Sequence, residues 1–204
     1  MKKLFGVIIL IILVAGAGWF VAGRGAVVDP LKTGNSDKAV WVVPISNARV
    51  RITKKPFGLF ISPQNSPVSP ERFTGYHTGV DFETFADEQN VDVPISAVCN
   101  GELIYKNRVS GYGGVAIQSC ILNGQSITVL YGHLKLSSIM PALYATLTAG
   151  QKIGVLGQGY STETDGERKH LHLSVHKGMA IELRGYVQKE SELSAWFDFA
   201  TLDF

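Results

Sequence analysis

Apolar residues in most of this chain occur in short runs that are separated by turn residues. The runs are WVVPI, ARVRI, ISAV, ELIY, VAIQ, SITVLY, KIGVLG and LHLSV, spread between about Val40 and Val187. Short runs rich in β-branched residues predict β-strands. Asn123 and Gly124 stand between two such runs, and both accept a positive φ, which predicts a tight hairpin. The pattern therefore predicts a mainly β domain, without a long amphipathic helix.

The N-terminus has a different pattern. An almost unbroken apolar run extends from Leu4 to Gly23 behind Lys2 and Lys3. Such a run is about long enough to cross a hydrocarbon layer of ~30 Å as one helix, with the lysines on the cytoplasmic side. A cleaved signal peptide is the alternative, because Ala15 and Ala17 are spaced as a signal peptidase requires. The run continues beyond these alanines, which favours an uncleaved anchor, and both readings predict an extracytoplasmic domain.

Breaks in the pattern divide the chain into four parts. We expect a transmembrane anchor or signal peptide over residues 1–23, a linker over 24–39, the β domain over 40–188 and a C-terminal tail over 189–204. Within the domain, the stretch from Ser62 to Thr74 is rich in proline and serine and predicts a long surface loop. Such a loop either borders a site or is an insertion without a role.

Length and charge narrow the class of protein. A chain of 204 residues with 46% hydrophobic residues accommodates one domain with its own core. The formal charge is only +2, and lysine and arginine are scattered along the chain. Nucleic-acid binding requires a concentrated basic face, so this class is not expected. The mild positive charge is compatible with an anionic cell envelope.

The two cysteines agree with export. Cys99 and Cys120 lie symmetrically about Ser110 and Gly111, between two predicted strands. If those strands pair across the turn, the cysteines face each other and an oxidising compartment closes them into a disulfide. Two buried free thiols are the alternative.

Histidine and aspartate are spaced as a metal site requires. His77 and Asp81 are four residues apart in HTGVD, and His170 and His172 are two apart in HLH. Residues separated by an even number lie on one face of a strand, so each pair is expected to point to the same side of a sheet. Two imidazole nitrogens and one carboxylate oxygen suit a tetrahedral Zn²⁺ with a fourth position for water. His133, in LYGHL, is a candidate for proton transfer or oxyanion stabilisation beside such an ion.

The ordered set HTGVD, LYGHL and HLH resembles the lysostaphin-type (LytM-like) zinc metallopeptidases, which cut the peptide part of bacterial peptidoglycan. The resemblance covers roughly Val50 to Val175 and includes GYGGVAI and AGQKIGVLG. It implies a compact antiparallel β-sheet or sandwich fold with a narrow groove over one zinc ion. It further implies a role for each of five residues. These are His77, Asp81 and His172 as zinc ligands, and His133 and His170 as unligated catalytic histidines.

The resemblance leaves two questions open. Where family members commonly carry a short STGxP approach to HLH, this chain has the longer, charged GYSTETDGERKHLH, which puts substrate preference in doubt. The same fold can also lose catalysis and regulate other wall hydrolases, although every expected ligand is present. The expected partners are peptidoglycan stem peptides, the membrane through the N-terminal segment and a possible protein regulator, but no nucleic acid.

Overall fold

The structure is a computed structural model that describes residues 41–202. Its strands are β1 (Phe60–Ile61), β2 (Gly75–His77), β3 (Val80–Glu83), β4 (Pro94–Ser96), β5 (Gly101–Val109), β6 (Gly113–Leu122), β7 (Gln125–Leu134), β8 (Thr146–Leu147), β9 (Lys152–Val155), β10 (His170–Lys177), β11 (Tyr186–Val187) and β12 (Trp196–Phe197). The described residues also form five 3₁₀ turns: η1 (Ala48–Arg51), η2 (Ala86–Glu88), η3 (Leu136–Ser138), η4 (Glu190–Ala195) and η5 (Phe199–Thr201).

The expected anchor or signal segment and the linker lie outside the described residues. Between residues 41 and 202, no helix has the length and apolar character that crossing a membrane requires.

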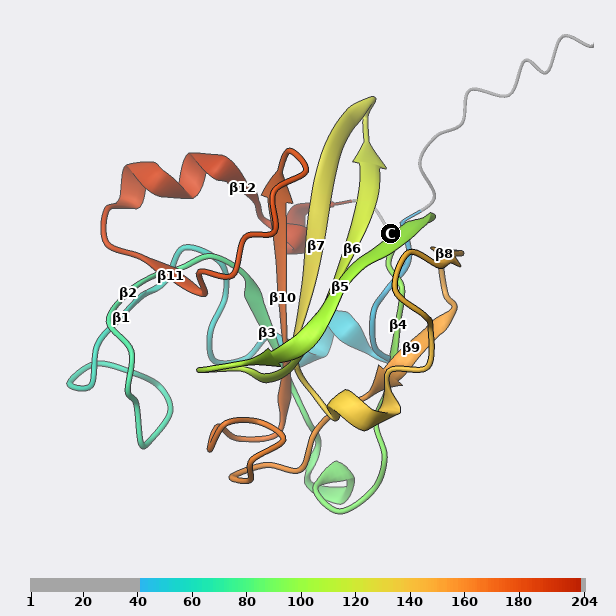
Figure 1. Ribbon diagram of the computed structural model, residues 1–204. Coiled ribbons are helices and arrows are strands. Elements are labelled where there is room, and N and C mark those ends of the chain that lie inside the picture. The colour runs from blue at the N-terminus through green and yellow to red at the C-terminus, as the bar shows by residue number, and fades with distance from the viewer. Residues whose placement is uncertain (1–40, 203–204) are drawn as a thin grey trace, which may run out of the picture. The chain divides into compact units, whose positions relative to one another are not determined.

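The largest sheet has seven strands and forms the centre of the domain. Its order is β12-β10-β7-β6-β5-β8, and β3 pairs with the other end of β10. Each of these pairs is antiparallel. Figure 1 shows the long strands β5, β6, β7 and β10 side by side. The mainly β, antiparallel fold predicted from the sequence is therefore confirmed.

The predicted hairpin joins β6 to β7. Leu122 and Gln125 are register partners, so Asn123 and Gly124 form a two-residue turn. Both turn residues have positive φ, 50° and 77°. This backbone conformation suits the right-handed twist of the two strands, and asparagine and glycine adopt it at low cost.

Two small sheets complete the fold. β1, β2 and β11 form one, and β4 and β9 form the other. In the first, Tyr186 of β11 is the register partner of His77 on β2. The three-stranded sheet therefore brings a late segment of the chain next to the first histidine of the predicted site.

The runs WVVPI and ARVRI are not strands, contrary to the expectation from sequence. Residues 41–45 have no regular structure, and the second run includes η1. Asn47 between them has a φ of 55°, which interrupts an extended chain. Their apolar residues Trp41, Ile45 and Ala48 are nevertheless buried in the core. The apolar pattern here reflects burial of a loop rather than strand pairing.

The segment expected to be a C-terminal tail is part of the fold over its described residues. Trp196 and Phe197 of β12 pair with His176 and Val175 of β10. Trp196 and Phe199 are buried. Burial of two large aromatic side chains favours docking of this segment on the domain.

Cys99 and Cys120 form the expected disulfide. Cys120 lies in β6, whereas Cys99 precedes the first residue of β5. Both cysteines belong to the buried apolar cluster that fills the domain. The bond therefore links the entry of β5 to β6 within the core.

Candidate metal centre

Three side-chain atoms from three strands converge on one point. His77 Nε2 lies 2.9 Å from His172 Nδ1 and 3.2 Å from Asp81 Oδ1, and His172 Nδ1 lies 3.1 Å from Asp81 Oδ1. Tetrahedral zinc with ligands at ~2.0–2.1 Å separates its ligand atoms by roughly 3.3 Å. The donor set and the triangle of about 3 Å sides therefore fit a zinc ion, and all three residues are buried.

The strands place these ligands by register rather than along one strand. His172 on β10 is the direct cross-strand partner of Asp81 on β3. His77 lies on β2, in a different sheet, so the expectation that His77 and Asp81 share one strand face was wrong. Thr78 and Gly79 connect the two strands, and a Cβ at Gly79 would lie 2.9 Å from His172 Nε2 and 2.4 Å from Leu173 O. Only glycine allows this close approach.

Outer contacts select the tautomers that a metal needs. His77 Nδ1 lies 3.2 Å from the carbonyl oxygen of Pro56 and can donate its proton there, which leaves the lone pair on Nε2. His172 Nε2 lies 3.5 Å from the Tyr112 hydroxyl, while Nδ1 faces the other two ligand atoms. Hydrogen bonds of this kind orient metal-ligating imidazoles.

His133 and His170 lie together beside this triangle. Their ring centroids are 4.2 Å apart. His170 Nδ1 lies 2.9 Å from the carbonyl oxygen of Arg168, and its Nε2 lies 3.3 Å from Asp81 Oδ2. His133 is the last residue but one of β7 and has a φ of 60°. Its buried Nδ1 has no hydrogen-bond partner among the described residues. A strained backbone and an unpaired polar atom are features that cluster at functional sites.

Burial and neighbouring charges set the protonation states. Burial alone would raise the pKa of Asp81, but the neighbouring His170 and His77 and the hydrogen bonds with His170 and His172 outweigh it and hold this pKa well below the usual value. Burial lowers the pKa of His172 to about 4, and burial with the neighbouring His170 also lowers the pKa of His133. At neutral pH Asp81 is therefore an anionic carboxylate and His172 a neutral imidazole, which are the forms that bind divalent metals.

A cavity of about 300 Å³ adjoins these groups. Asp81, His133, His170 and His172 line it together with aromatic and apolar side chains, namely Phe73, Tyr112, Leu183 and Tyr186. The site is therefore concave and is lined by charged and polar side chains as well as by aromatic ones, so it can hold a ligand that has both polar and apolar parts.

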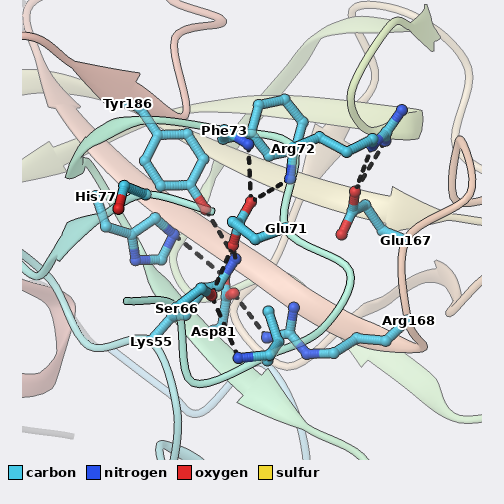
Figure 2. Close-up of polar contacts among 12 residues, drawn as sticks. Lys55, Ser66, Glu71, Arg72, Phe73, His77, Asp81, Glu167, Arg168 and Tyr186 are labelled. Atoms are coloured by element: carbon cyan, nitrogen blue, oxygen red, sulfur yellow. Dashed lines mark hydrogen bonds and ion pairs between the residues drawn. The ribbon is translucent and has the colours of Figure 1, made fainter. Parts of the chain in front are cut away.

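The proline- and serine-rich loop borders this cavity, since Phe73 and Thr74 line it. Figure 2 shows Glu71 of the loop beside Lys55, and both side chains of this ion pair are almost fully buried. Glu71 also accepts hydrogen bonds from Ser66 and from the backbone N–H of Phe73. One end of the loop is thus fixed to the domain by an internal carboxylate.

The same loop is bound to the charged segment ahead of HLH. Arg72 donates to Glu167 at 2.8 Å (Figure 2). It also donates to the carbonyl oxygen of Asp165 at 2.7 Å. Phe73 stacks on Tyr186 with ring centroids 5.3 Å apart. Two segments that the sequence left without a role are therefore partners at the edge of one cavity.

Sequence reasoning missed several residues of this site. Tyr112, Tyr186 and Lys55 had no signal of their own, because tyrosine and lysine are common on β surfaces. Arg168 belonged to the charged segment, but nothing in the sequence indicated which charge points inward. The remaining histidine, His176, packs against Trp196 and is not part of the triangle.

An antiparallel β domain in which two histidines and an aspartate converge beside two further histidines is typical of hydrolytic metal centres. The chain belongs to peptidase family M23, because the model of that family matches residues 75–183. This match confirms the resemblance to lysostaphin-type peptidases.

Several solved structures are similar to this chain. A structure described as LytU is 26% identical, with 72% of this chain and 80% of that chain covered and a TM-score of 0.48. The solution structure of lysostaphin is 27% identical, with coverage of 67% and 49% and a TM-score of 0.43. Csd3 of Helicobacter pylori is 24% identical, with coverage of 68% and 32% and a TM-score of 0.44. The chain thus spans about a third of Csd3 and half of lysostaphin. No curated protein matches the sequence.

Proposed function

We propose that this domain is a zinc-dependent endopeptidase that hydrolyses peptide cross-links of bacterial peptidoglycan. Membership of peptidase family M23 supports the assignment of a peptidase activity. The observation that carries the proposal is the convergence of His77, Asp81 and His172 within hydrogen-bonding distance of one another, with His133 and His170 beside them. These residues would supply both the metal ligands and the proton-transfer groups, and four of the five line one cavity.

The residues divide the chemistry between them. His77, Asp81 and His172 would hold the zinc ion, which would supply Lewis-acid activation of water and of the scissile carbonyl. His170 is held by the Arg168 carbonyl oxygen at Nδ1 and by Asp81 Oδ2 at Nε2, which places its imidazole beside the ligand triangle as a proton-transfer group. The unpaired His133 Nδ1 is placed to hydrogen-bond the substrate where negative charge develops. Phe73 and Tyr186 offer apolar contact to the peptide.

A non-catalytic module that binds the wall and regulates other hydrolases is the second candidate. Loss of a ligand or of a catalytic histidine would favour it, but all five residues are present and brought together. A zinc carboxypeptidase or an amidase acting on the same polymer would differ in its products.

Product analysis tests the proposal. The full chain, purified in detergent and loaded with zinc, is expected to convert cross-linked peptidoglycan dimers into monomers, read by mass spectrometry. A chelator should stop the conversion, and added zinc should restore it. Release of a terminal amino acid would indicate a carboxypeptidase, and release of stem peptides from glycan an amidase. No product from zinc-loaded protein would contradict the endopeptidase and favour the regulatory module.

We also propose that the domain lies outside the cytoplasmic membrane. The apolar run near the N-terminus supports this location, and so does the Cys99–Cys120 disulfide, because such bonds persist in oxidising compartments. In cells quenched with acid and then denatured, both thiols should react with a maleimide only after reduction. A variant without residues 1–23 is the control, and its thiols should react directly. Direct reaction of the full chain would contradict export.

A further inference from the structure

Arg168 contacts Asp81, the carboxylate of the proposed metal site, on the oxygen that does not face the two histidine ligands. Its Nη2 donates to Asp81 Oδ2 at 2.8 Å, while Asp81 Oδ1 faces the nitrogens of His77 and His172. We propose that Arg168 is a positioning residue that fixes Asp81 so that only Oδ1 is presented to the metal. This inference rests on the zinc site of the proposed function.

Glu83 holds Arg168 in place. The Arg168 Nε donates to both carboxylate oxygens of Glu83, at 3.1 and 3.0 Å, and Nη2 donates to Oε1 as well. The three side chains are nearly buried, with exposed fractions of 9% for Arg168, 12% for Glu83 and 2% for Asp81. A planar guanidinium has donors along two edges, so one arginine can bind both carboxylates in fixed directions.

The register of β3 and β10 explains why a cation is needed here. Asp81 and Glu83 are two residues apart on β3 and pair with His172 and His170, so both carboxylates point to the same face. Two buried carboxylates this close repel each other, and Glu83 would compete with Asp81 for a metal ion. Arg168 neutralises Glu83 and keeps it engaged, which leaves Asp81 as the carboxylate ligand.

A purely electrostatic role would have the opposite sign. A cation near a metal site repels the metal ion, so removing the charge of Arg168 would tighten zinc binding if charge alone mattered. Removing a positioning contact weakens binding, typically by about 10–100-fold. Lys54 supplies a matched control, because its ammonium lies 3.7 Å from Glu83 Oε2 and its side chain is 44% exposed. Among the described residues, the Lys54 ammonium pairs with Glu83 and not with Asp81.

The experiment measures the zinc dissociation constant of the metal-free full chain by competition with a chromophoric chelator. Arg168→Gln is expected to weaken zinc binding about 10–100-fold. Arg168→Lys keeps the positive charge but lacks the planar guanidinium that binds both carboxylates. Its zinc affinity should lie between that of Arg168→Gln and that of the wild type. Lys54→Gln should bind zinc as the wild type does. Circular dichroism and thermal unfolding report whether each variant is folded; if Arg168→Gln is not, the comparison of Arg168→Lys with Lys54→Gln decides.

The outcomes separate this inference from the proposed function. Unchanged or tighter zinc binding by folded Arg168→Gln, or by folded Arg168→Lys if only that variant folds, would overturn the role of Arg168 while leaving the zinc site intact. An equal loss in Lys54→Gln would also overturn it, because the effect would then be one of general charge. A wild-type chain that does not bind zinc, or a His172→Ala variant that binds it equally well, would instead refute the metal site itself.

Discussion

Replacement of His172 by alanine is expected to abolish both zinc binding and hydrolysis. His172 Nδ1 lies 2.9 Å from His77 Nε2 and 3.1 Å from Asp81 Oδ1, so it occupies one corner of the ligand triangle. Two protein ligands would remain, fewer than the three that catalytic zinc sites use. Metal content after dialysis and conversion of cross-linked dimers are the two measurements.

His176→Ala is the matched control for this variant. His176 lies on the same strand, β10, but its ring packs against Trp196 rather than against the ligands. It should retain the zinc and the activity of the wild type. A zinc-free but fully active His172→Ala protein would contradict the assignment of the ligands.

Replacement of His133 should leave zinc bound and remove most of the rate. His133 lies beside His170 and is not part of the ligand triangle. Loss of a group that transfers a proton or stabilises charge in the transition state typically costs about 10²–10⁴-fold in kcat. KM for cross-linked fragments should change little, because the aromatic lining of the cavity is retained.

Because His133 has a positive φ, the alanine variant should be compared with an asparagine variant. Its φ of 60° is unfavourable for alanine but tolerated by asparagine. If the imidazole is what matters, His133→Ala and His133→Asn should lose rate equally and keep one zinc per chain. Recovery of the rate in the asparagine variant would show that the loss in the alanine variant came from backbone strain. Loss of zinc in both folded variants would make His133 a ligand instead.

Local patterns predicted much of the central sheet. Asn123 and Gly124 determine their turn by their own backbone preferences, and the run around LHLSV is strand β10 as expected. Local patterns failed where tertiary contacts decide. The stretch at residues 41–52 is rich in apolar residues because it covers the core. Its backbone makes isolated hydrogen bonds, such as Val42 N–H to Val98 O and Ser96 N–H to Pro44 O, rather than the continuous ladder of a strand.

In the candidate site, too, local pattern predicted part of the arrangement and tertiary contacts decided the rest. The even spacing of His170 and His172 places both on one face of a single strand, as the period of β structure requires. The spacing of His77 and Asp81 suggested one strand as well, but the chain turns at Thr78 and Gly79 and the two residues belong to different sheets. They still meet, because Gly79 allows the backbone to approach His172 closely.

The sequence by itself predicted the class of fold, because strand periodicity and turn preference are local properties of the chain. Its ordered motifs carried the resemblance to the family and, through it, the five residues of the candidate site. Only the tertiary structure decided which oxygen of Asp81 faces the ligand triangle, that Arg168 and Glu83 stand behind it, and that Arg72 joins the loop to Glu167. These contacts join residues 85 to 95 positions apart. Ion pairs depend on distance and burial in space, and neither can be read from the order of residues before the sheets are paired.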